Sequence, residues 1–175
     1  MPVEIVVSPS ERPCQGTLAW PRGEARCALG RGGVSATKRE GDGATPAGVL
    51  PLRYVYYRSD RLTQPATRLS VRAIEPEDGW CDDPASPEYN RPVRRPFPGR
   101  HEILWRADAL YDLVVVLGWN DAPPVANRGS AIFLHVAAQD YAPTEGCVAL
   151  ARQDLLRLLA DCGQGDRLIV NLPRP

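Results

Sequence analysis

Apolar residues along the chain fall in many short stretches rather than in long helical repeats. Each stretch is rich in β-branched or aromatic residues and ends near Gly, Pro, Asn or Asp, which is the pattern of β-strands. Residues 114–117 and 132–134 are continuous apolar runs, so we expect central strands that are buried on both faces. The expected strands cover residues 3–7, 25–29, 50–57, 69–74, 112–119, 131–136 and 167–172.

Near the C-terminus one stretch has the spacing of an amphipathic helix. Gly163 follows this stretch and is expected to end the helix. A shorter helical turn is expected at residues 107–110. Four apolar residues at positions i, i+3, i+4 and i+7 define the buried face of the main helix: Leu155, Leu158, Leu159 and Cys162.

The composition agrees with a mostly β fold in one domain. The chain of 175 residues contains 18 Pro and 15 Gly, spread along its whole length, which favours strands and turns over long helices. Hydrophobic content is 43% and charged content 24%, which are ordinary globular values. No linker or internal repeat interrupts the sequence, so we expect one domain over residues 1–175. Residues 84–99 contain five prolines and are expected to form a long surface loop.

Charge and hydropathy exclude two classes of function. The 21 basic and 21 acidic residues give a formal net charge of +0, which lacks the positive field of a nucleic-acid or anionic-membrane binder. No segment approaches the ~20 apolar residues of a membrane span. The first seven residues have the pattern of a strand, and no signal peptide is visible there.

The cysteine and histidine counts narrow the candidate chemistry. Five cysteines cannot all pair within the chain, so at least one thiol stays free or bridges to another molecule. A disulfide between Cys14 and Cys27 is an option if the protein is exported. There is no CxxC pair and the two histidines lie far apart in the sequence, so we predict no structural zinc site. The pair Asp82 and Asp83 has no further ligands at a suitable spacing, and no metal or organic cofactor is expected.

The strongest candidate for chemistry is a histidine followed by a Gly-Cys pair. His135 ends an apolar strand, a polar loop follows, and the loop closes on Gly146 and Cys147 before the predicted helix. An adjacent imidazole can activate a thiol as a nucleophile, and the amides of Gly146 and Cys147 can hold an oxyanion. The pattern alone is also compatible with a buried, inert Cys147 and a hydrogen-bonded strand-end His135.

Two further groups are weaker candidates. Trp80, Tyr89 and Asn90 are predicted to line a substrate groove, although an aromatic residue that fixes the long loop to the core explains them equally well. His101 and Glu102 have the composition of an acid/base pair, but their position beside Arg100 favours a solvated strand start.

The arrangement of these motifs resembles the L,D-transpeptidases of the YkuD type. Residues 132–148 are similar to that family's signature, in which a strand-end His precedes Ser/Thr-x-Gly-Cys and an aliphatic residue. Upstream, residues 38–48 resemble the family's Gly-Asp and Thr-Pro-x-Gly hairpin. Residues 129–133 match a small-domain branch of the family. The resemblance extends from about residue 3 to residue 172 and implies a β-sandwich or barrel with one or two short helices, one of them after the nucleophile.

The resemblance assigns roles to individual residues. Cys147 matches the nucleophile and His135 the residue that accepts and donates the proton. Gly146 and Cys147 match the backbone donors to the oxyanion. Thr144 matches the Ser/Thr position of the motif, although a hydroxyl there also serves simply to cap a turn.

Three positions depart from the family pattern on the substrate side. Glu145 stands where many members have a second His, Ala149 replaces a common Arg or Asn, and Val136 replaces Gly or Ser. The nucleophile and the base are unaffected. Glu145 is expected to repel an anionic substrate or to pair with a cationic group, and it joins Thr144 among the expected substrate-binding residues.

The implied activity is peptidoglycan L,D-transpeptidation through a thioester on Cys147, which forms cross-links between a donor and an acceptor stem peptide. Hydrolysis of the same thioester, as in a carboxypeptidase or amidase, is the first alternative. A non-catalytic cell-wall-binding module is the second. The resemblance implies a location in the periplasm or cell envelope, and we expect a monomer whose partners are stem peptides, without nucleic acid.

Overall fold

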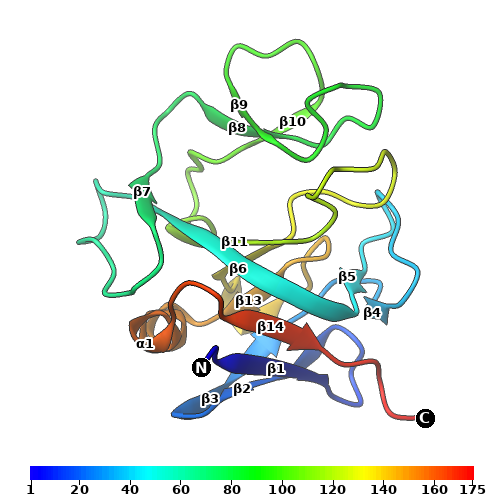
Figure 1. Cartoon of the computed structure of the whole chain (residues 1–175), viewed down its shortest axis with the longest axis vertical. Coiled ribbons are helices and arrows are strands. Elements are labelled where there is room, and N and C mark those ends of the chain that lie inside the picture. The colour runs from blue at the N-terminus through cyan, green and yellow to red at the C-terminus, as the bar shows by residue number, and fades with distance from the viewer.

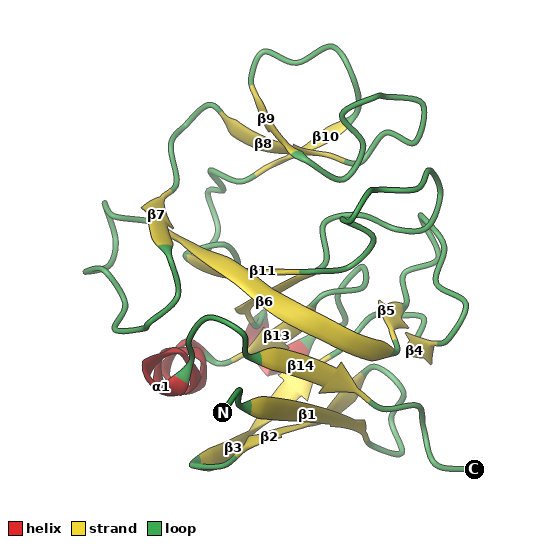
Figure 2. Ribbon diagram, in the orientation of Figure 1, coloured by secondary structure: helices red, strands yellow, loops and turns green.

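The computed structural model describes residues 1–175 and has a closed β-barrel at its centre (Figure 1). Eight strands follow one another around the barrel in the order β11-β12-β13-β3-β2-β1-β14-β6, and a pairing between β6 and β11 closes the ring. The fold is therefore mostly β, as predicted (Figure 2). The barrel strands are β1 (Glu4–Pro9), β2 (Gln15–Trp20), β3 (Gly23–Ala28), β6 (Gly48–Tyr57), β11 (Leu113–Leu117), β12 (Phe133–Val136), β13 (Val148–Leu150) and β14 (Arg167–Val170).

The long strand β6 closes the barrel because it has two partners on one edge and a third on the other. Residues 48–51 pair with β14, and residues 55–57 pair in parallel with β7 (Val71–Ala73). The opposite edge pairs with β11 through residues 52–57. This strand of ten residues thus joins β14 to β11 and completes the ring.

A second, three-stranded sheet lies above the barrel in Figure 1. It consists of β8 (Asp78–Cys81), β9 (Pro92–Arg94) and β10 (His101–Ile103), in the order β10-β8-β9. The segment predicted as a long loop therefore contains strand β9, which pairs with β8. Strands β4 (Val34–Ser35) and β5 (Thr45–Pro46) pair in parallel, so the Thr-Pro segment does not form the expected hairpin.

The predicted helix is present as α1 (Arg152–Asp161) and covers one end of the barrel (Figure 1). The three leucines of its predicted face, Leu155, Leu158 and Leu159, are buried in the main hydrophobic core. Cys162 caps the C-terminus of the helix and is buried as well. The helical turn predicted at residues 107–110 is wrong, since this segment forms bends and a turn, and the only other helical turn is a 3-10 turn at Gln139–Tyr141.

Strands β11 and β12 are buried on both faces, which confirms the prediction from their apolar runs. Alternate residues of β11 point into the barrel core, among them Val115, and the others point outward toward the second sheet, among them Val114. The outward residues form a separate core cluster together with Phe133, Trp80 and Cys147. The nucleophile candidate therefore lies between the barrel and the three-stranded sheet.

Three further observations concern the candidate chemistry. All five cysteines are free thiols, so Cys14 and Cys27 are not bonded to each other. No group of three or more His, Cys, Asp or Glu side chains is arranged to hold a metal ion. None of the helices combines the length and the apolar composition that crossing a membrane requires.

Candidate active site

The sheet register brings the two predicted catalytic residues together. Strands β12 and β13 are parallel neighbours, with Leu134 opposite Val148 and His135 opposite Ala149. Cys147, one residue before β13, therefore lies level with Phe133, two residues before His135. Because side chains alternate along a strand, His135 and Cys147 point to the same face of the sheet, about 6.6 Å apart along the strands and about 4.8 Å across them.

Both side chains line one cavity of about 430 Å³ between the barrel and the small sheet. The walls of this cavity come from β10, from the segment before β11, from the loop after β12 and from the turn before β5. Four carboxylates and two guanidinium groups line it, so it is polar and both charges are present: Glu40, Asp82, Glu102, Glu145, Arg100 and Arg106.

Cys147 is buried and is held by two hydrogen bonds from the segment that precedes and begins β12. Its Sγ donates to the carbonyl of Ala131 at 3.2 Å and accepts the N–H of Phe133 at 3.4 Å. Burial raises the pKa of the thiol to about 12, and the carboxylate of Glu102 adds to the rise, while Lys38 opposes it. At neutral pH the thiol is therefore protonated before substrate arrives.

The imidazole of His135 is buried and neutral. Burial lowers its pKa to about 4, although a hydrogen bond to Val136 favours the protonated form. Nδ1 lies 2.9 Å from the carbonyl oxygen of Val136, which only accepts, so Nδ1 carries the proton and Nε2 has a free lone pair. The resting pair is thus a neutral thiol with a neutral base, and a general-base mechanism follows rather than a preformed thiolate–imidazolium pair.

The turn between Thr144 and Cys147 is fixed by its own hydrogen bonds. The hydroxyl of Thr144 donates to the carbonyl of Cys147 at 2.6 Å and accepts the N–H of Gly146 at 3.1 Å. The Gly146 amide therefore already has one acceptor, while the Cys147 N–H has none among the backbone hydrogen bonds. Of the two expected oxyanion donors, the Cys147 amide is the one free to bind a substrate oxygen.

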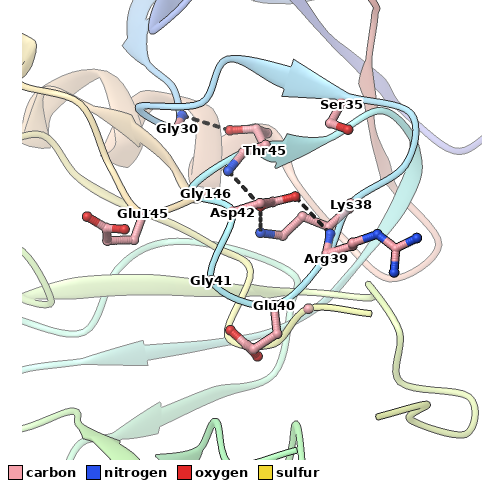
Figure 3. Close-up of polar contacts among 12 residues, drawn as sticks. Gly30, Ser35, Lys38, Arg39, Glu40, Gly41, Asp42, Thr45, Glu145 and Gly146 are labelled. Carbon is pink, nitrogen blue, oxygen red and sulfur yellow. Dashed lines mark hydrogen bonds and ion pairs between the residues drawn. The ribbon is translucent and has the colours of Figure 1, made fainter. Parts of the chain in front are cut away.

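The segment that contains Thr45 and Pro46 packs against this turn (Figure 3). The Asp42 carboxylate accepts from Lys38 Nζ at 2.6 Å and from the N–H groups of Arg39 and Ala44. This network fixes Ala44, whose carbonyl lies only 2.8 Å from where a Cβ on Gly146 would be. Residues 38–48 thus help to fix the position of the turn at residues 144–147.

We expect Gly146→Ala to destabilise the fold and to displace the nucleophile. Gly146 has φ of +134°, which side chains rarely adopt, and the added Cβ would meet the Ala44 carbonyl. The expected loss is about 2–4 kcal/mol of unfolding free energy in urea denaturation. Gly165→Ala is the matched control because Gly165 has φ of +90° with nothing within 4 Å, and it is expected to lose about 1–2 kcal/mol. Equal losses for both variants would contradict the contact with Ala44.

Of the expected substrate-binding residues, the structure places Thr144 and Glu145 in the cavity wall. Glu145 is exposed and pairs with Arg31 at 3.0 Å. Its charge is therefore partly balanced before any substrate arrives. The structure does not place the other three expected residues in this cavity.

Trp80, Tyr89 and Asn90 are buried and support the wall from behind. Trp80 packs edge-to-face on Phe133 and donates to Asn90 Oδ1 at 3.0 Å. The same Asn90 oxygen accepts the N–H of Ala131, a residue at φ of +53° whose carbonyl holds the thiol of Cys147. Asn90 therefore stabilises a strained residue that positions the thiol of Cys147.

Tyr111 and Glu102 line the cavity; Tyr111 was not predicted from the sequence, and Glu102 was considered only as the partner of His101. Tyr111 packs edge-to-face against His135, with ring centroids 5.3 Å apart, and its hydroxyl donates to Glu102 at 2.7 Å. Burial raises the pKa of both groups. No local motif marks either residue, because Tyr111 precedes β11 and Glu102 lies in a short strand of the second sheet. His101, which the sequence offered as an acid/base partner of Glu102, instead forms a hydrogen bond through Nδ1 to the carbonyl of Gly99 and packs on Phe97.

A buried thiol and a neutral imidazole at one cavity of a β-barrel are groups that cysteine acyl transfer can use. The model of the L,D-transpeptidase catalytic domain family, YkuD, matches residues 2–170, and the chain belongs to this family. A solved L,D-transpeptidase from Mycobacterium smegmatis is similar over 97% of this chain and 59% of that chain, with 13% identity and a TM-score of 0.43. The comparison with curated proteins gives no match.

Proposed function

We propose that the protein is a peptidoglycan L,D-transpeptidase that joins stem peptides through a thioester on Cys147. The observation that carries the proposal is the position of Cys147 and His135 on one face of adjacent strands, in one cavity, in a chain of this family. The family acts on peptidoglycan peptides, which supports stem peptides as the substrates.

In the first half of the reaction, His135 Nε2 takes the thiol proton as Sγ attacks the donor carbonyl. Burial keeps both partners neutral until then, so the ion pair forms only as negative charge moves onto the carbonyl oxygen. The Cys147 N–H stabilises that oxyanion, and the Gly146 N–H contributes if Thr144 releases it. His135 then gives its proton to the leaving amine, and the thioester is complete.

In the second half, an amine of the acceptor peptide attacks the thioester and the thiol is released. Thr144 and Glu145 are the proposed contacts of the peptide at the rim. We propose no direct contact with the peptide for Trp80, Tyr89 and Asn90, which hold the cavity wall in place. Membership of a family whose members typically act in the cell envelope supports a location there.

Incubation of the purified protein with defined muropeptides tests this function. We expect cross-linked dimers to accumulate, detected by mass after chromatographic separation. Trimmed monomers without dimers would replace the proposal by the carboxypeptidase or amidase alternative. Neither product, together with no covalent adduct on Cys147, would leave the cell-wall-binding alternative.

A further inference from the structure

Glu102 lines the cavity and takes part in no ion pair. It lies in the middle of β10 and pairs with Trp80 of β8, so the two side chains share the face that packs toward Phe133. Its carboxylate accepts a hydrogen bond from the hydroxyl of Tyr111 at 2.7 Å. The two arginines of the cavity are paired with other carboxylates, Arg100 with Asp82 and Arg106 with Asp108.

The surroundings of Glu102 favour its neutral form more than water does. Burial is the largest effect and raises its pKa, and the nearby charges of Asp82 and Glu40 act in the same direction. The Tyr111 hydroxyl and Arg106 oppose the rise. Glu102 in turn raises the pKa of Cys147, which places its charge within electrostatic reach of the reacting sulfur.

The second half of the proposed reaction requires two protons to leave the acceptor nitrogen. A primary amine of the lysine type has a pKa of ~10.4 and enters the cavity as an ammonium ion, without a lone pair. One proton must leave before attack, and a second leaves as the new amide forms. His135 is neutral again after the first half, so it can accept only one of the two.

We propose that Glu102 accepts the first of these protons and so acts as a second catalytic base for the acceptor amine. This inference rests on the proposed function. The ammonium gives one proton to the Glu102 carboxylate, which leaves a neutral amine and a carboxylic acid. The amine nitrogen then forms its bond to the thioester carbon, its second proton moves to His135 Nε2, and the carbon–sulfur bond breaks. His135 returns that proton to the leaving sulfur, and Glu102 releases its own to solvent.

Burial of the Glu102 carboxyl group favours this transfer. An ammonium–carboxylate pair and the corresponding neutral pair differ by two charges, and burial disfavours both charged forms. The proton therefore moves more readily here than the ordinary pKa difference in water implies. The Tyr111 hydroxyl holds the carboxyl group in place, because a hydroxyl can donate to it in either protonation state.

The test compares how the acyl-enzyme divides between an amine and water. The thioester is formed from a donor muropeptide, Nα-acetyl-lysine is added as the acceptor probe, and amide and hydrolysis products are counted by mass. In Glu102→Gln the ratio of amide to hydrolysis product at pH 7 is expected to fall at least about tenfold. The ratio should recover as the pH approaches the pKa of the probe's amine, ~10.4, because the probe then arrives already deprotonated. A purely structural role for Glu102 would not produce this pH dependence.

Two further variants and the wild-type protein serve as controls. Asp121→Asn also removes a carboxylate, but one that is paired with Arg53 and does not line the cavity, and it should change the ratio by less than about twofold. Glu102→Asp keeps the carboxylate and should retain most of the ratio, which supplies a second variant if Glu102→Gln does not fold. An unchanged ratio and pH profile in Glu102→Gln would overturn the inference. If the wild-type protein forms no thioester at all, it is the proposed function that fails instead.

Discussion

Replacement of Cys147 by Ala is expected to abolish acyl transfer and to remove the site of covalent modification. Without the sulfur no thioester forms, so the rate of muropeptide cross-linking should fall by at least about 10⁴-fold. Intact mass after exposure to a carbapenem should show one adduct on the wild-type protein and none on Cys147→Ala. The fold should survive, because removal of one buried sulfur costs only about 1 kcal/mol.

Cys162→Ala is the matched control for this experiment. Cys162 is also a buried free thiol, and burial likewise raises its pKa to about 12. It belongs to the barrel core rather than to the cavity, so its variant should keep the adduct and the transfer rate. An adduct that persists in Cys147→Ala, or that disappears in Cys162→Ala, would contradict the assignment of the nucleophile.

Replacement of His135 by Gln is expected to slow thioester formation by about 10²–10⁴-fold, the usual contribution of a general base. In the wild-type protein the rate should be level from near pH 8 down to about pH 5 and should fall as the pH drops through the His135 pKa of about 4. The reason is that the base is lost when Nε2 is protonated. In His135→Gln this acid limb should disappear.

The low pKa of His135 also predicts how the free energy of unfolding depends on pH. Burial lowers the pKa of His135 from 6.5 to about 4, so between these values the unfolded chain binds a proton that the folded chain does not. Stability should therefore fall as the pH drops below 6.5, and this residue alone accounts for about 2 kcal/mol between pH 8 and pH 5. The difference in urea unfolding free energy between pH 8 and pH 5 should be smaller in His135→Gln by that amount.

His101→Gln is the control, since His101 is the other histidine of the chain and does not line the cavity. Its variant should keep both the rate and the acid limb. A His135→Gln protein that forms the thioester at the wild-type rate would show that another group serves as the base.

The strands with continuous apolar runs were predictable because burial on both faces leaves a clear local pattern. Strand β2 was missed, since its inward residues Gly16, Leu18 and Trp20 alternate with polar or small ones and include a glycine. The strands of the second sheet were missed because they are three or four residues long and lie among prolines. Strand β13 was missed because it has only three residues, and it separates Cys147 from the helix.

What the amino-acid sequence by itself determined is the order of the chemistry along the chain: a strand-end histidine, a Gly-Cys turn, an amphipathic helix and a mostly β fold. These features depend on the spacing of residue types along the chain, which can be read directly from the sequence. Only the tertiary structure decided which partners each group has. In the folded protein Trp80 and Asn90 lie behind the wall of the cavity, whereas Glu102 lines the cavity. The reason is that a second sheet packs on the outer face of β11 and β12. That packing also sets the charge states of His135 and Cys147, since desolvation depends on everything that surrounds a side chain and not on its neighbours in sequence.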